Sequence, residues 1–134
     1  AKIHAHHNEQ CFIDHIAEQS SMFGLEINET PAISHQIVDD EQISLGKIKL
    51  HVLFTPGHSP GGVCYYCEEN NLLFSGDTIF LESVGRTDLY GGSEEKLRNS
   101  IHTKIFTLPD NTTIYPGHGP STSVGYEKNS NWYI

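Results

Sequence analysis

Residues 50–58 read LHVLFTPGH, so an apolar run with the composition of a β-strand ends abruptly in Pro-Gly-His. The same ending closes residues 112–118, TTIYPGH, and a third strand-like run, LLFSGD at residues 72–77, ends in Gly-Asp. Proline and glycine end each run sharply and fix the loop that follows. If the three strands share one sheet and one direction, His58, Asp77 and His118 meet at the same edge. Two imidazoles and a carboxylate are good ligands for zinc or iron, so the sequence predicts a metal site there.

Length and charge narrow the possible functions. The chain has 134 residues, which fits a single domain spanning residues 1–134 with a core of its own. The formal net charge is −9, from 17 acidic and 8 basic side chains. Without a basic stripe to meet phosphates, we expect no nucleic-acid or anionic-membrane partner, whereas a metal cation suits an acidic chain. No apolar run approaches the length of a membrane span, and no signal peptide is visible.

Three cysteines, Cys11, Cys64 and Cys67, are too few for a disulfide framework. The last two form a C-x-x-C pattern inside a run with strand composition. In a strand, residues three apart point to opposite faces, so we expect no functional thiol pair. Free thiols fit a reducing, cytoplasmic setting.

Periodicity and turn signals predict an alternation of strands and helices. We expect strands at residues 2–5, 48–54, 63–67, 72–75 and 112–115, a short strand within residues 37–45, and helices at residues 7–20, 93–106 and 122–128. Residues 22–31 and 79–92 should be irregular. The clearest helix starts at Ser93, a favourable N-cap followed by two glutamates in the first turn. Its core-facing residues recur at every fourth position: Leu97, Ile101 and Ile105.

Four motifs follow one another in a fixed order: TPGHSPG at residues 55–61, FSGDTIF at 74–80, GRTD at 85–88 and YPGHGP at 115–120. Their order and spacing resemble the metallo-β-lactamase-fold hydrolases, in particular the short glyoxalase II-like branch. Residues 19–26, QSSMFGLE, also resemble the segment that this branch carries upstream of its third metal-binding histidine. The resemblance extends from residue 1 to the C-terminus.

This resemblance implies an α/β fold, the αββα metallo-β-lactamase-type sandwich, with two metal ions that are usually zinc and sometimes iron or manganese. By the resemblance, His58 would bind one ion, His118 the other, and Asp77 would bridge both. The activity it implies is hydrolysis, in which metal-activated water attacks a thioester or another acyl carbonyl. The substrate would be a small acyl compound.

The family's hallmark segment T-H-x-H-x-D-H, which supplies three further histidines and an aspartate, is absent from this sequence. Residues 4–9, HAHHNE, contain the H-x-H, but Asn8 and Glu9 stand where Asp and His belong. Residues 14–15 supply the D-H without the two earlier histidines.

Three hypotheses account for this absence. In the first, our working hypothesis, the chain is the C-terminal part of a longer hydrolase whose hallmark precedes Ala1, and residues 2–5 form the strand after it. In the second, His4, His6 and Asn8 are a degraded hallmark. In the third, no metal binds and the motifs are relics. With three protein ligands left, we expect the isolated chain to bind metal weakly and to show little activity.

Two other functions remain open, a non-catalytic interaction module and a mononuclear metal-binding protein that uses His58, Asp77 and His118 alone. Half of a sandwich should also expose an apolar sheet face and therefore self-associate.

Around the predicted site, we expect Arg86 and Asp88 to form an ion pair that orients their loop, and Thr78 to support the site. The rings of Phe80 and Tyr90 could line the pocket, but an aromatic ring in such a loop more often packs in the core, which is what we expect here. The remaining histidines of interest should be ordinary surface or core residues: His7, His35, His51 and His102.

Overall fold

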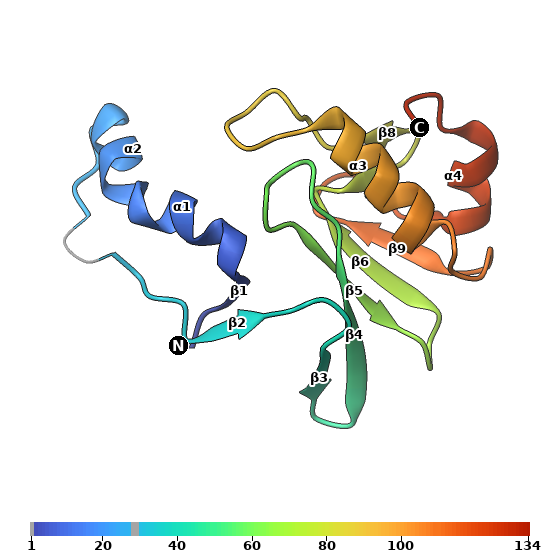
Figure 1. Ribbon diagram of the computed structural model, residues 1–134. Helices are drawn as coiled ribbons and strands as arrows, with labels where there is room; N and C mark the ends of the chain where they lie inside the picture. The colour runs from blue at the N-terminus through green and yellow to red at the C-terminus, as the bar shows by residue number, and fades with distance from the viewer. Residues whose placement is uncertain (1, 28–29) are drawn as a thin grey trace.

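A computed structural model describes residues 2–27 and 30–134; the predicted irregular segment 22–31 thus includes two positions, Asn28 and Glu29, outside the described residues. Its centre is a six-stranded mixed sheet with the order β10-β9-β6-β5-β4-β3 (Figure 1). The strands are β3 Gln42–Leu45, β4 Ile48–Phe54, β5 Val63–Cys67, β6 Leu72–Gly76, β9 Thr113–Pro116 and β10 Thr122–Ser123.

The three strands that precede the candidate ligands run in the same direction. Strands β4 and β6 are both antiparallel to β5, which lies between them, and β9 is parallel to β6. Their C-terminal ends therefore lie at one edge of the sheet, as the sequence predicted.

One helix covers one face of this sheet (Figure 1). Helix α3, Glu94–Ser100, continues as a π-helical turn, Ile101–Ile105. The side chain of Ser93 caps it by accepting a hydrogen bond from the backbone N–H of Lys96. The predicted core residues of this helix are fully or almost fully buried and pack on strand residues of the same cluster: Leu97, Ile101 and Ile105 against Cys64, Leu73 and Ile114. A shorter helix, α4 Val124–Ser130, starts at a second serine cap, Ser123.

The N-terminal segment lies beside the opposite end of the sheet order, next to β3 and β4. Strands β1, His4–His6, and β2, His35–Ile37, form a two-stranded parallel pair. A 3₁₀ turn, His7–Glu9, directly follows β1 in the chain. Helices α1 Gln10–Asp14 and α2 Ile16–Met22 come next. The single helix predicted over residues 7–20 is therefore wrong in detail, because it is interrupted at His15.

Backbone turns set the limits of two predicted segments. Residues 37–45 contain the short strand that the sequence predicted, β3, and the chain turns before it at Asp40 (φ 62°), so that β2 and β3 enter different sheets. Residues 79–92 are not wholly a loop, because they contain a small hairpin, β7 Ile79–Phe80 and β8 Ser83–Val84. Its turn places Glu82 at φ 53°, a left-handed conformation that the composition did not signal.

The face of the sheet opposite α3 retains exposed apolar side chains. Phe74 and Tyr115 are 42% and 45% exposed, and their rings stack with centroids 5.9 Å apart. Ile48 on β4 is 45% exposed. These three residues define what we call the open sheet face, and they fit the expectation that half of a sandwich leaves apolar surface uncovered.

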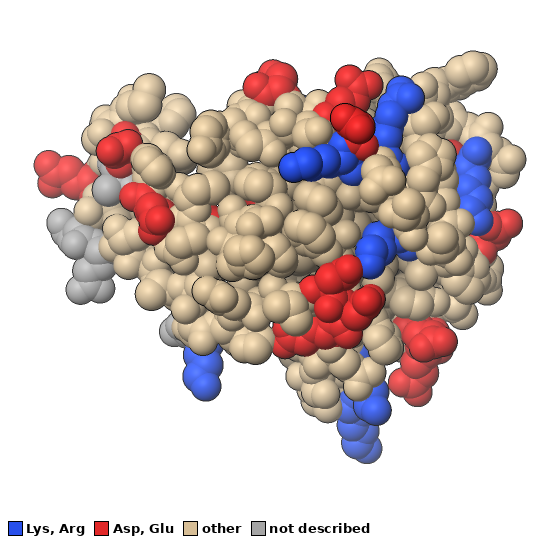
Figure 2. Space-filling model, in the orientation of Figure 1, with Lys and Arg blue, Asp and Glu red and all other residues tan. Residues whose placement is uncertain are grey.

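The surface charge, the helix lengths and the state of the cysteines bear on the predicted partners and setting. On the face shown in Figure 2, lysines and arginines are scattered among acidic side chains and do not form a continuous basic stripe. Among the described residues, no helix is both long and apolar enough to cross a bilayer. All three cysteines are free thiols.

Candidate metal centre

The three predicted ligands lie together at one edge of the sheet. His58 follows β4, Asp77 directly follows β6, and His118 follows β9. Asp77 lies between the two histidines: its Oδ2 is 3.7 Å from Nε2 of His58, and its Oδ1 is 2.9 Å from Nδ1 of His118. The carboxylate thus presents one oxygen to each imidazole.

The hydrogen bond on the far side of the His58 ring fixes which nitrogen is available. Nδ1 of His58 lies 2.9 Å from the carbonyl oxygen of Arg86, which can only accept, so Nδ1 carries the proton. In the neutral imidazole this tautomer leaves the lone pair on Nε2, which faces Asp77. Metal-binding histidines usually donate their second N–H in this way. The 3.7 Å gap is too long for a hydrogen bond but close to the roughly 3.4 Å between two ligands of one tetrahedral zinc.

These residues fit a bridging carboxylate better than a closed mononuclear site. In the part of the chain that the structure describes, no three His, Cys, Asp or Glu side chains close around a common point that could hold an ion. Instead, two nitrogen–oxygen pairs share Asp77. His118 is also 77% exposed at its side chain, which leaves its side of the site open. Each of the three side chains could donate to a metal ion, and the resemblance implies that Asp77 would be shared between two ions.

Two glycines allow the loops to approach Asp77. A Cβ atom on Gly117 would lie 2.5 Å from Oδ1 of Asp77. A Cβ atom on Gly85 would lie 1.9 Å from the backbone oxygen of Asp77 and 3.1 Å from Cβ of His58. The sequence analysis placed Gly117 in the loop that follows a strand and Gly85 in the motif at residues 85–88, and it did not predict that either glycine packs against the candidate ligands.

Helix α3 holds the chain leading into His58. The backbone N–H of Ser93 donates to the carbonyl of Gly57 at 2.8 Å, and the hydroxyl of Ser100 donates to the carbonyl of Pro56 at 2.8 Å. Gly57 has φ 143°, and a Cβ there would lie 2.4 Å from Cα of Leu97. The Pro-Gly-His turn at residues 56–58 therefore packs directly against helix α3.

Buried polar groups lie beneath the site. The hydroxyl of Thr55 is 3.4 Å from that of Thr78 and 3.3 Å from Sγ of Cys64. All three residues are buried, and burial raises the pKa of the Cys64 thiol. Cys64 is thus a protonated partner within the core, and Thr78 supports the loop after Asp77 from beneath.

An apolar hollow of about 430 Å³ lies beside His118. Its walls are the side chains and backbone of Phe80, Leu81, Ser83, Gly119 and Pro120. The ring centroid of Phe80 is 6.2 Å from that of His118. The prediction that Phe80 packs in the core is therefore wrong, because this half-buried ring lines the hollow. Tyr90 is also outside the core and exposed, with its ring edge towards Phe12.

The loop between Asp77 and α3 contains the predicted ion pair. Both guanidinium nitrogens Nε and Nη2 of Arg86 donate to the carboxylate of Asp88 at 2.8 Å. These hydrogen bonds lower the pKa of Asp88 to about 2. Since both side chains are mostly exposed, the pair shapes the loop more than it stabilises the fold.

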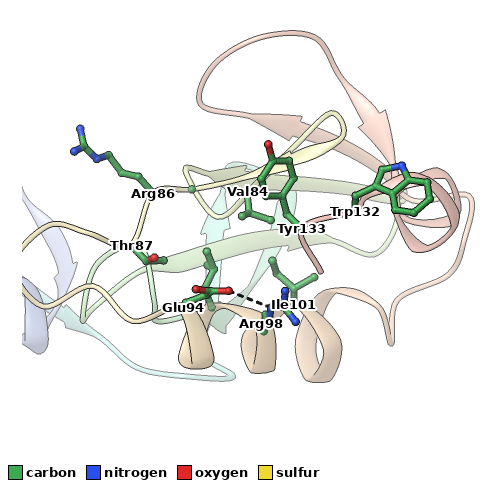
Figure 3. A pocket seen from close by; sticks show the side chains of 10 residues that line it. Val84, Arg86, Thr87, Glu94, Arg98, Ile101, Trp132 and Tyr133 are labelled. Carbon is green, nitrogen blue, oxygen red and sulfur yellow. Dashed lines mark ion pairs between the residues drawn. The ribbon is translucent and has the colours of Figure 1, made fainter.

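A second hollow, about 350 Å³, lies between α3 and the C-terminal residues (Figure 3). Glu94 and Arg98 form an ion pair of 3.6 Å at its margin, and Trp132 is 94% exposed. Arg86 also borders this hollow, but Figure 3 shows its guanidinium pointing away from the other labelled side chains.

The segment considered as a degraded hallmark has other partners. The ring of His4 lies against that of His35, 5.2 Å away, and the ring of His6 stacks on Phe54 at 4.3 Å. Nδ1 of His6 accepts a hydrogen bond from the backbone N–H of Asn8. These contacts give the segment a packing role and lend no support to a second set of metal ligands there.

Comparison with known proteins shows which family the chain resembles. A family model described as the metallo-beta-lactamase superfamily matches residues 1–118. The chain is 42% identical over 134 residues to a probable metallo-hydrolase, YqgX, of Bacillus subtilis, covering 98% of this chain and 63% of that protein. It is 35% identical over 119 residues to the mitochondrial persulfide dioxygenase ETHE1 of Bos taurus, covering 83% of this chain and 47% of that protein.

Solved structures of similar proteins have the same fold as this chain. The crystal structure of BLEG-1 B3 metallo-beta-lactamase has a TM-score of 0.86 and 38% identity, covering 98% of this chain and 64% of that one. The crystal structure of TTHA1623 in a di-iron-bound form has a TM-score of 0.82 and 32% identity, covering 99% and 65%. The predicted α/β fold is confirmed, and the chain corresponds to less than two thirds of the length of these relatives. The chain belongs to the metallo-β-lactamase superfamily.

Proposed function

We propose that the chain is part of a metal-dependent hydrolase that cleaves a thioester or another small acyl compound, with zinc as its metal. The observation that carries the proposal is the position of Asp77, with one carboxylate oxygen towards each of two histidines from separate loops. Metal ions bound there would supply a hydroxide near neutral pH and polarise the acyl carbonyl.

The chain's own residues have separable roles in this proposal. His58 would offer Nε2 to a metal ion, because the carbonyl of Arg86 keeps Nδ1 protonated. The Asp77 carboxylate and the His118 imidazole would supply the other ligands from this chain. The hollow along Phe80 and Pro120 receives the apolar part of the acyl group, because it adjoins His118 and is mostly apolar. Free thiols favour a cytoplasmic setting for this activity.

Persulfide oxidation is a second candidate, because a persulfide dioxygenase is among the relatives at 35% identity. The two candidates differ in what they consume. A hydrolase releases a thiol and an acid without oxygen, whereas a dioxygenase consumes oxygen.

The test is an assay of the full gene product, loaded with zinc or iron, on a panel of acyl thioesters and on a persulfide. We expect zinc-dependent thiol release that is lost in Asp77→Asn and retained in Asp110→Asn, a surface carboxylate paired with Lys128. Oxygen consumption with the persulfide and no thioester cleavage would replace this proposal with the second candidate. An upstream reading frame without T-H-x-H-x-D-H, together with a metal-free product, would overturn both.

A further inference from the structure

The N-terminal segment contacts the loop that follows His58, although about fifty residues separate them in sequence. Oε1 of Glu9 accepts two hydrogen bonds, from the hydroxyl of Ser59 at 2.7 Å and from the backbone N–H of Gly61 at 2.6 Å. The side-chain amide of Asn8 donates to the carbonyl of Pro60 at 3.1 Å. Three successive residues of the loop are thus held from one side.

This contact requires a close approach of the two segments. Gly61 is buried, and a Cβ atom there would lie 2.7 Å from both Cγ and Oε1 of Glu9. Any larger residue would displace the carboxylate. Because an ionised acceptor forms shorter and stronger hydrogen bonds than a neutral one, Glu9 is well suited to hold this backbone N–H.

The position of Glu9 is itself fixed by the core. His6, three residues earlier, is buried, and its ring stacks on Phe54, the last residue of β4. Nδ1 of His6 accepts the N–H of Asn8 and starts the 3₁₀ turn that contains Glu9. The segment is therefore anchored at the end of the same strand that leads to His58.

The loop is held on two sides by different elements. Helix α3 fixes residues before His58 through the carbonyls of Pro56 and Gly57. Asn8 and Glu9 fix the residues after it. Without Glu9, the chain on the C-terminal side of His58 would lose the hydrogen bonds to Ser59 and Gly61.

We propose that Glu9 is a positioning residue for His58: its carboxylate holds residues 59–61 so that the imidazole keeps its bond to the Arg86 carbonyl and presents Nε2 to Asp77. The role in metal binding rests on the proposed function, whereas the role in holding the loop does not.

Three variants test it: Glu9→Ala, Glu9→Gln and, as a control for loss of one negative charge, Glu18→Ala on an exposed part of α2. The first readout is taken without metal, from hydrogen exchange of the Gly61 amide and from ¹⁵N signals of the His58 ring. We expect about tenfold faster exchange in Glu9→Ala, with loss of the single Nδ1–H tautomer. Glu9→Gln keeps an acceptor oxygen and should restore most of the protection. Glu18→Ala should match the wild type.

The second readout is zinc affinity by calorimetry, for which Glu9→Ala should bind roughly tenfold more weakly than Glu9→Gln. Unchanged Gly61 exchange and His58 signals in Glu9→Ala would overturn the proposal, as would equal changes in Glu18→Ala. Zinc affinity is measured on the full gene product; if its wild type binds no zinc but the metal-free spectra change as expected, the proposed function fails and the positioning role stands. If Glu9→Ala does not fold, Ser59→Ala removes one of the two bonds and should shift the His58 signals in the same direction; unaltered signals there would also refute the role.

Discussion

Nδ1 of His118 lies 2.9 Å from Oδ1 of Asp77, although the two residues are 41 positions apart in the sequence. The contact exists because β6 and β9 are parallel neighbours, so that the loops after them lie side by side. It makes His118 the exposed member of the candidate site, and its removal should affect binding more than folding.

Replacing His118 by alanine should therefore lower zinc affinity by at least tenfold, since it removes a proposed ligand and since the loss of a hydrogen-bond partner of a metal ligand alone costs about that much. The melting temperature without metal should stay near that of the wild type, because the ring is largely exposed. Elemental analysis and calorimetry measure the effect. His102→Ala, at an exposed position on the π-helical turn, is the control, and equal zinc loss in both would contradict the assignment.

Gly117→Ala should weaken metal binding by displacing Asp77. The added methyl group would lie 2.5 Å from Oδ1, and the carboxylate can move only by leaving its place between the two histidines. Gly85→Ala should instead destabilise the fold by about 1–3 kcal/mol, because its methyl group meets a backbone oxygen at 1.9 Å. Zinc titration and urea unfolding separate the two. A Gly117→Ala protein with unchanged affinity would show that Asp77 need not be held there.

Glu127 should be important for stability. It is 1% exposed, and its carboxylate accepts hydrogen bonds from Thr122 at 2.5 Å, the backbone of Glu82 at 3.0 Å and Asn131 at 2.8 Å. Glu127→Gln puts an N–H group against one of these donors, so the free energy of unfolding should fall by about 1–3 kcal/mol. Urea unfolding measures it, with Glu94→Gln at an exposed position as control. Equal stability of both variants would refute the role.

Stability should depend on pH through His6. Burial lowers the pKa of its imidazole below 6.5, and the neighbouring His7 acts in the same direction. The unfolded chain therefore binds this proton more readily, so the free energy of unfolding falls as pH drops below about 6.5 and is unaffected by this group at higher pH. His6→Phe keeps a ring against Phe54 and should lose less stability than the wild type between about pH 7.5 and 5.5. An identical pH dependence in both proteins would count against burial as the cause.

The open sheet face should drive self-association. Phe74→Ser combined with Tyr115→Ser removes two stacked and exposed rings, and should raise the monomer fraction in sedimentation experiments without a large loss of stability. Leu89→Ser changes an exposed apolar side chain elsewhere and should have no such effect. A wild-type chain that stays monomeric at high concentration would contradict the prediction.

The strands before the three ligands could be predicted because each is an apolar run ended by proline or glycine. The helix from Ser93 could be predicted because its cap and its apolar spacing agree. The turn at Asp40 and the hairpin at Glu82 could not, because non-glycine residues rarely adopt a positive φ and composition does not mark the exceptions. For Phe80 the sequence offered both the pocket and the core and favoured the core, since the residue type alone does not distinguish a ring in a core from one beside a hollow.

By itself, the sequence determined which side chains can bind a metal and that they follow strands, because residue type and local backbone preference are properties of short segments. Only the tertiary structure decided that Asp77 lies between His58 and His118, and that Glu9 holds the loop that follows His58. Those relations depend on strand order, parallel direction and close approach at glycines, which are set by packing among residues far apart in the chain.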